Sequence, residues 1–148
     1  MTLKAKITED MKAAMRARET ARLSTIRLLL AAMKQKEVDE RVELTDADIL
    51  GIIDKMIKQR RESITQFEAG GRAELAAAER AEIEILQGYM PQRLTEAEID
   101  ALVDAAIAGA GVTGMAAMGK VMATLKPQLA GRADMGTVSA RVKTRLDT

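Results

Sequence analysis

The chain has 148 residues and a formal net charge of +1, and it contains no Cys and no His. It therefore lacks disulfides, metal sites ligated by Cys or His, and catalytic triads built on either residue. Its two aromatic residues, Phe67 and Tyr89, are too few for the aromatic platform on which many proteins stack single-stranded RNA. The balanced charge also argues against a general nucleic-acid coat, so any such contact must come from a local patch.

The N-terminal part is rich in Ala, Leu, Glu, Lys, Arg and Met, and its apolar residues recur at helical spacing. Thr45 and Asp48 resemble a capping box at the start of one helix, and Gly70 with Gly71 is a favourable stop for it. We expect helices over residues 2–18, 20–40, 45–69 and 73–87. Pro91 disfavours helix at Met90, so the segment around it predicts a hinge or boundary.

The C-terminal part predicts three shorter helices. A full capping box, Thr95 to Glu98, opens the first, and the glycines that follow end it. The second is expected over residues 115–125 with Pro127 closing it, and the third begins at the N-cap residue Asp134. We therefore predict an all-α fold with an N-terminal domain of four long antiparallel helices, 1–90, and a small three-helix domain, 91–148. The alternative is one continuous seven-helix domain.

Several motifs resemble catalytic signatures without completing them. The segment from Gly114 to Val121 nearly matches a phosphate-binding loop, but Val121 replaces the hydroxyl residue that would hold Mg²⁺. We interpret Gly119 as a small residue that allows close helix packing, with Lys120 on the surface. Acidic side chains of the fourth helix (Glu79, Glu82, Glu84) are interpreted as a solvated face, and the serines lack a nucleophile context (Ser24, Ser63, Ser139). We predict no catalytic residue, no cofactor and no metal.

Two clusters of basic residues lie in the N-terminal part. One surrounds the turn between the first two helices (Arg16, Arg18, Arg22, Arg27), and the other lies on the third helix (Lys55, Lys58, Arg60, Arg61). Acids such as Glu19 and Asp54 are interleaved with them, which is typical of a solvated, ion-paired face. We prefer that interpretation, with phosphate contact as the alternative.

The segment from Lys126 to Asp134 is the most suggestive of binding. It places Arg132 just before a helix N-terminus, where backbone N–H groups and the helix dipole favour an anion. Lys120, Arg141, Lys143 and Arg145 could extend this into a basic edge. The alternative is a plain connection between helices, in which Asp134 itself occupies the N-terminal donors. The sequence leaves both open.

Two stretches together resemble the YqeY proteins of the GatB/YqeY family: E-I-E-I-L-Q-G-Y-M-P-Q over residues 82–92, and G-K-V-M over 119–122 followed by G-R-A-D over 131–134. The resemblance implies an all-helical fold with a small C-terminal three-helix domain. That domain is similar to the tail of GatB, a subunit of the amidotransferase that amidates misacylated tRNA, where the tail helps to hold the tRNA. By this analogy, the residues expected to contact RNA backbone are Lys120, Lys126, Arg132 and Lys143.

The amidase and the phosphorylating domain of that amidotransferase are absent from this sequence, so the family label of carbon–nitrogen ligase is not expected to describe an activity of its own. The predicted function is a non-catalytic module that binds tRNA or a tRNA-handling protein. The alternatives are a protein–protein adaptor and an accessory enzyme with a residual active site. Because the sequence has no apolar run of about 20 residues, no apolar N-terminal signal segment and no Cys, we expect a cytoplasmic protein without membrane contact. The oligomeric state is left open.

Overall fold

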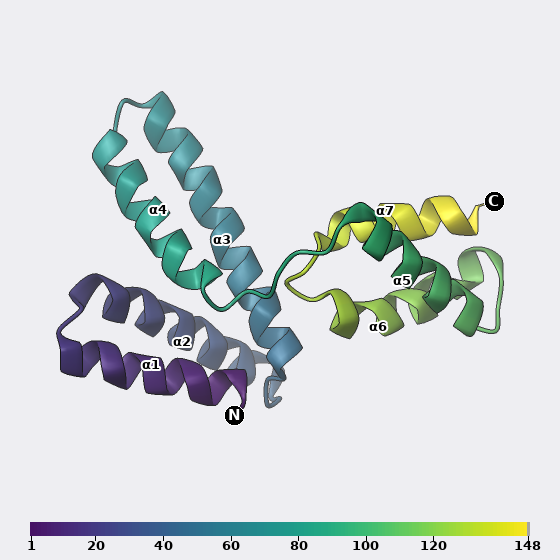
Figure 1. Cartoon of the computed structure of the whole chain (residues 1–148), viewed down its shortest axis with the longest axis horizontal. Helices are drawn as coiled ribbons and strands as arrows, with labels where there is room; N and C mark the ends of the chain where they lie inside the picture. Colours follow the sequence, from purple (N-terminus) through teal and green to yellow (C-terminus); the bar gives the residue numbers. More distant parts are fainter. Residues whose placement is uncertain (148) are drawn as a thin grey trace. The chain divides into compact units, whose positions relative to one another are not determined.

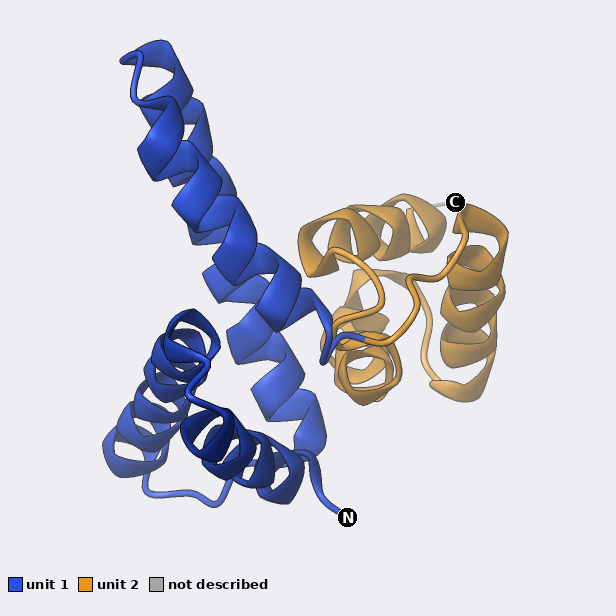
Figure 2. Ribbon diagram, turned by 60° about the vertical axis from the view of Figure 1, so that its left-hand side comes forward, with its two compact units in different colours: residues 1–90 blue, residues 91–148 orange. Residues whose placement is uncertain are grey.

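The structure, a computed structural model, describes residues 1–147, which form seven α-helices and one 3₁₀ helix without any strand. The all-α prediction is confirmed. The chain falls into two compact units, unit 1 from residues 1–90 and unit 2 from residue 91 on (Figure 2). That each unit folds as an independent domain remains a prediction. No single helix of the described residues is long and apolar enough to cross a membrane.

Unit 1 consists of two antiparallel helical hairpins (Figure 1). The first pairs α1 (Leu3–Ala17) with α2 (Thr20–Glu40), and the second pairs α3 (Asp46–Ala69) with α4 (Ala73–Gln87). Both views show the end of the α3–α4 hairpin extending beyond the α1–α2 hairpin (Figures 1 and 2). The fully buried core residues come from all four helices: Ile7, Ile26, Leu29, Met33, Ile49, Ile53, Ile57 and Leu86.

The helix boundaries of unit 1 follow the predicted signals. Thr45 Oγ1 accepts a hydrogen bond from the Asp48 N–H, and Asp48 accepts one from the Thr45 N–H, so the capping box forms with Asp in the third position. The left-handed residue after α3 is Gly71, at φ 72°, two residues after the last helical residue, Ala69. These local signals act within one turn of helix, which explains why sequence alone locates them.

Unit 2 packs three helices around a smaller core: α5 (Glu96–Gly109), α6 (Met118–Leu129) and α7 (Met135–Leu146), with the 3₁₀ helix η1 (Gly114–Ala117) before α6. Each of the three α-helices contacts the other two. The large buried side chains are Ile99, Val103, Val121, Leu125, Leu129, Val138 and Val142, and four buried alanines lie among them: Ala106, Ala110, Ala117 and Ala133.

Helix α6 differs from its prediction at both ends. It starts at Met118, because the preceding residues form η1, and it continues through Pro127 to Leu129. Pro127 removes one hydrogen bond in the last turn, whose acceptor Ala123 is exposed to solvent, while Leu125 and Leu129 are completely buried. Burial of these two leucines therefore outweighs the absence of one solvated bond.

Gly119 was expected to allow close helix packing, and this is wrong. A Cβ built at Gly119 would meet no atom within 4 Å, and the residue is exposed on α6. The neighbouring Val121, which replaces the hydroxyl of a phosphate-binding loop, is buried in the core. The segment is thus an ordinary helical turn.

Candidate nucleic-acid interface

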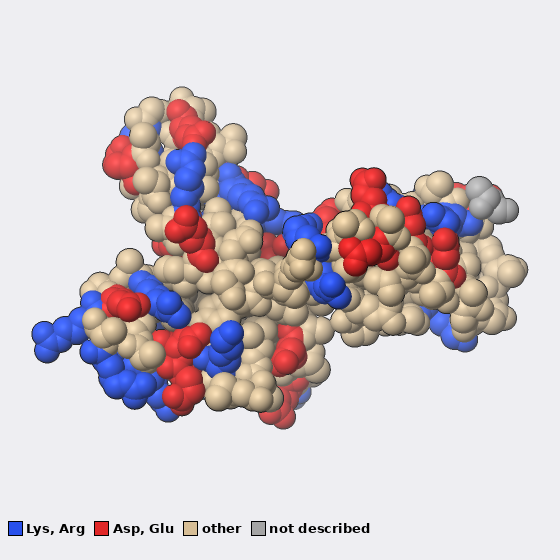
Figure 3. Space-filling view, in the orientation of Figure 1, with Lys and Arg blue, Asp and Glu red and all other residues tan. Residues whose placement is uncertain are grey.

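The charges of unit 2 are segregated by helix. Helix α5 carries four acidic residues and no basic one, whereas α6 and α7 carry five basic residues and no acidic one. Acidic side chains accordingly gather on the face of unit 2 turned to the viewer in Figure 3, with basic side chains among them. A unit of nearly balanced charge therefore has one acidic helix and two basic helices.

Two of the basic residues on α7 form ion pairs with acidic residues of α5. Arg141 lies 2.5 Å from the Asp100 carboxylate and 3.3 Å from Glu96. Arg145 lies 2.5 Å from Asp104. The hydrogen bond from Arg141 to Asp100 raises the pKa of this guanidinium above its usual value, so Arg141 stays charged. Both arginines thus join α7 to α5 by ion pairs, which makes them less available to bind an outside phosphate.

The three predicted lysines, Lys120, Lys126 and Lys143, are exposed and form no ion pair within the described residues. Helix geometry explains the contrast on α7. Arg141 precedes and Lys143 follows the buried Val142, so at about 100° per residue they leave the helix on opposite sides of its buried stripe. Only the Arg141 side faces α5. No hydrogen bond joins any two of these lysines, which form separate positive points on the surface of unit 2.

Arg132, the fourth predicted residue, is half-buried and already engaged. Its Nε donates to the carbonyl of Gln92 at 3.2 Å, and its own carbonyl accepts from the Leu94 N–H at 2.9 Å. It therefore fastens the α6–α7 connection to the start of unit 2.

At the N-terminus of α7, the Asp134 carboxylate accepts bonds from the N–H and the hydroxyl of Thr137, at 3.2 and 2.9 Å. This is the arrangement of the plain helix connection, in which Asp134 occupies the donors that an anion would need.

Sequence reasoning missed a polar cluster around Tyr89 in unit 1. The Tyr89 hydroxyl donates to Asp10 Oδ2 at 2.6 Å, and Lys6 Nζ lies 5.8 Å from the ring centroid. Burial, and then the Asp10 carboxylate, raise the pKa of Tyr89 well above its usual value, so the phenol stays protonated and donates. Arg22 and Glu84 complete the lining of an open cavity of about 400 Å³. Asp10 and Tyr89 are 79 residues apart, so no motif spacing could reveal the pair.

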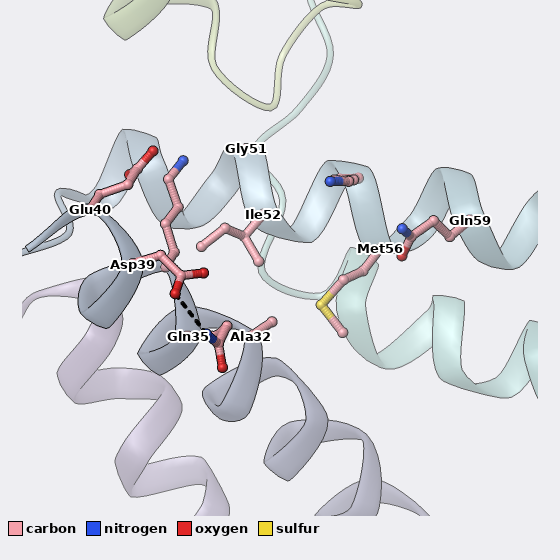
Figure 4. A pocket seen from close by; sticks show the side chains of 10 residues that line it. Ala32, Gln35, Asp39, Glu40, Gly51, Ile52, Met56 and Gln59 are labelled. Carbon is pink, nitrogen blue, oxygen red and sulfur yellow. Dashed lines mark hydrogen bonds between the residues drawn. The ribbon is translucent and has the colours of Figure 1, made fainter.

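An open groove of about 510 Å³ lies between α2 and α3 in unit 1 (Figure 4). Its apolar lining comes from Ala32, Ile52 and Met56. The other side chains around it are polar, with charges of both signs, and Gln35 is hydrogen-bonded to Asp39 at 2.8 Å. A mixed lining of this kind fits a peptide or helix surface better than a small charged ligand.

The acidic residues of α4 do not assemble a metal site. Glu82 is paired at 2.6 Å with Arg60, whose side chain is only 13% exposed. Across residues 1–147, no three acidic side chains converge in a way that could hold a metal ion.

Comparison with known proteins gives one family and a set of fungal relatives. A family model described as Yqey-like protein matches residues 4–146. A protein of Lachancea thermotolerans named "Altered inheritance of mitochondria protein 41, mitochondrial" is 39% identical over 102 residues, which cover 67% of this chain and 54% of the relative. The protein of the same name from Pyrenophora tritici-repentis is 34% identical over 137 residues, covering 90% and 75%. That of Eremothecium gossypii is 41% identical over 87 residues, covering 58% and 48%.

The match spans about half the length of the relatives from Lachancea and Eremothecium. Their names contradict the cytoplasmic location expected from the sequence, because each of these relatives is named as a mitochondrial protein. That expectation was wrong because it depended on missing features: an apolar span, a signal segment and cysteines. Such absences do not distinguish one aqueous compartment from another.

Proposed function

The chain belongs to the YqeY-like protein family, and we propose that it is a non-catalytic module whose unit 2 holds tRNA by the phosphate backbone. The observation that carries the proposal is the set of three exposed lysines without ion pairs, Lys120, Lys126 and Lys143, on the two helices that carry no acid. The resemblance of unit 2 to the tail of GatB supplies the class of ligand. Arg132 would act mainly by holding the α6–α7 connection in place.

Three separate lysines are suited to recognising the shape of a folded RNA rather than its sequence. Lysine is a compact charge on a flexible stem, and it approaches phosphates without a fixed bidentate geometry. Contacts of this kind position a protein on a nucleic acid and carry little sequence information. The module would therefore bind folded RNA generally, with an affinity that falls as salt rises because bound counterions are released.

The test is binding of bulk tRNA to the full chain across a salt series. A triple variant, Lys120→Gln with Lys126→Gln and Lys143→Gln, should weaken binding and reduce the slope of log affinity against log salt by roughly one for each phosphate-binding lysine removed. The matched control removes three exposed positive charges from α3: Lys55→Gln, Lys58→Gln and Arg61→Gln. If the wild-type chain fails to bind at low salt, or the two triple variants behave alike, unit 2 does not hold RNA in this way.

The groove between α2 and α3 favours a second candidate, a protein–protein adaptor. Two residues of its apolar floor, Ala32 and Ile52, are only partly covered, and a partner helix could bury them between the charged rims. Ala32→Glu would place a charge on that floor and abolish such binding, whereas tRNA affinity would change little. Purification of a protein complex that survives high salt and is absent in Ala32→Glu would support the adaptor.

A further inference from the structure

A long basic stretch of the chain lies in unit 1, outside the proposed RNA site. Residues 12–27 contain five basic residues and one acid, Glu19. They surround the turn that joins α1 to α2, and Figure 3 shows basic side chains gathered around this end of the hairpin. All five are exposed. We define the α1–α2 basic surface by these residues: Lys12, Arg16, Arg18, Arg22 and Arg27.

The charges of this surface are poorly neutralised. Arg16, Arg18 and Arg27 form no ion pair within residues 1–147. Lys12 lies 3.6 Å from Glu9 and Arg22 lies 3.9 Å from Glu19, and all four of these side chains are about half exposed. Exposed pairs at such distances contribute little, so the positive potential of the surface persists.

The basic cluster of α3 is neutralised more fully than the α1–α2 basic surface. The two clusters, which share one interpretation at the level of sequence, therefore need separate interpretations. Lys58 is paired with Asp54 at 3.3 Å, and Arg60 with Glu82 at 2.6 Å on the packed side of the hairpin. Interleaved acids therefore do neutralise part of the α3 cluster. At the α1–α2 turn, Lys12 and Arg22 are paired with exposed acids, so the ion-paired face expected from the sequence is formed only in part. The three remaining arginines form no ion pair within residues 1–147: Arg16, Arg18 and Arg27.

Helix stability accounts for only part of the surface. Cations at the end of α1 are favoured by the negative end of the helix dipole, which suits Arg16 and Arg18. Arg22 lies in the first turn of α2, where the positive end of the dipole disfavours a cation. Arg27 lies beyond the reach of either end. Arg22 also lines the Tyr89 cavity together with Asp10 and Glu84, which accounts for its charge within unit 1. Arg27 has neither an ion pair within residues 1–147 nor a helix end to favour it, and an anionic partner explains it better.

The side-chain chemistry selects phosphate as that anion. Four of the five residues are arginines, whose planar guanidinium binds phosphate oxygens in a bidentate manner. The exposed apolar side chains on these two helices near the turn, Met15 and Leu28, are each about half covered, which is too little apolar area to insert into a lipid surface. A repeated array of phosphates, as in RNA, matches cations spread over two helices and a turn.

We propose that the α1–α2 basic surface is a second contact for the phosphate backbone of folded RNA, with more positive charge than the lysines of unit 2. The inference rests on the proposed function for the class of partner, but the two contacts lie in different units and are separable by mutation. RNA binding would then be shared between arginines of unit 1 and lysines of unit 2.

The experiment measures bulk tRNA binding by full-length variants across a salt series. The unit 1 variant is Arg16→Gln with Arg18→Asn and Arg27→Gln, where Asn suits the left-handed backbone of residue 18, at φ 58°. The matched variant in unit 2 is Lys120→Gln with Lys126→Gln and Lys143→Gln. A charge-preserving control replaces the same three arginines with lysine. None of these side chains forms an ion pair, so thermal melting should stay unchanged and report any loss of fold.

We expect the affinity of the unit 1 variant to fall roughly tenfold, and its slope of log affinity against log salt to decrease by about two to three. The lysine control should retain most of that slope. If the unit 1 variant binds like the wild type while the unit 2 variant is weakened, the inference fails and the proposed function stands. The reverse pattern supports the inference and removes the proposed role of unit 2. If the wild-type chain binds no tRNA, or binds vesicles containing phosphatidylserine through these arginines instead, RNA is not the partner of this surface.

Discussion

The two units carry nearly balanced charge but differ in which of their charges are free. In unit 2, Arg141 and Arg145 are paired with acids of α5, and single lysines remain unpaired. In unit 1, few acids lie near the hairpin end that carries Arg16 and Arg18. These two arginines form no ion pair within the described residues. The two candidate surfaces therefore differ in how many of their cations lack an ion pair, and not in the net charge of their units.

The cores of the units differ as well. Unit 1 buries Ile, Leu and Met from four helices, each of which packs along its partner in a hairpin. Unit 2 places alanines such as Ala106 and Ala117 between its few large side chains, so its short helices approach closely. The stability of a short helix that buries few large side chains depends strongly on each of them. The following predictions test these contrasts, from the largest expected effect to the smallest.

Leu125→Ala should have the largest effect, because Leu125 is completely buried in the small core of unit 2. We expect a loss of about 2–5 kcal/mol in the free energy of unfolding. If unit 2 is a separate domain, hydrogen exchange will accelerate in residues 91–147 and not in 1–90. Leu29→Ala should give the converse pattern, and Leu28→Ala, a half-exposed neighbour, should change little. Uniform acceleration along the chain would show a single cooperative domain.

Glu96→Gln combined with Asp100→Asn should give unit 2 an unpaired arginine, because it removes both acids that are paired with Arg141. The release of Arg141 should raise the affinity for bulk tRNA severalfold and steepen the salt slope by about one. The control, Glu43→Gln with Glu62→Gln, changes net charge equally at exposed sites in unit 1. Equal gains from both double variants would mean that net charge alone determines binding.

Asp134→Ala should destabilise unit 2 by about 1 kcal/mol, because it removes the N-cap of α7. Urea unfolding followed by hydrogen exchange would measure the loss and locate it. Asp147→Ala alters an acid at the other end of the same helix, where the cap is the bond from the backbone N–H of residue 147 to the Lys143 carbonyl, which alanine retains, and it serves as the control. A loss that extends into α1–α4 would contradict separate stabilities of the units.

The smallest effect concerns Tyr89, the sole tyrosine, whose ionisation is directly visible in ultraviolet absorbance. Burial and the bond to Asp10 raise its pKa, so its stabilising contribution is complete below about pH 10 and is lost as the pH rises through the higher folded value. Asp10→Asn should shift this pKa toward the usual value, and Glu84→Gln, on the same cavity, should shift it less. Titration at the ordinary value in the wild-type chain would contradict the described contact.

Local signals explain why most of the fold could be predicted. Capping residues such as Thr45, Thr95 and Asp134 act on the backbone a few residues away, and each begins a helix as expected. The error at Pro127 has the opposite cause. A proline is a strong local stop signal, but Leu129 beyond it is held by tertiary burial.

The candidate surfaces were only partly predictable. Sequence spacing treated Arg141 and Lys143 as one basic edge, although Val142 between them sends the two side chains to opposite flanks of α7. It also treated the two basic clusters of unit 1 alike. Pairs such as Arg60 with Glu82 join different helices and have no signature in the sequence.

Sequence by itself therefore determined the helical class, the starts of the helices with side-chain caps and the family resemblance, because these depend on periodicity, caps and short motifs. Tertiary structure alone decided which cations are neutralised. Arg141 meets its acids only when α7 packs on α5, and Arg18 stays free because its hairpin end has no acidic helix beside it. A charge is local to its residue, but its pairing depends on residues distant in the chain, which is why the free arginines became evident only in the folded protein.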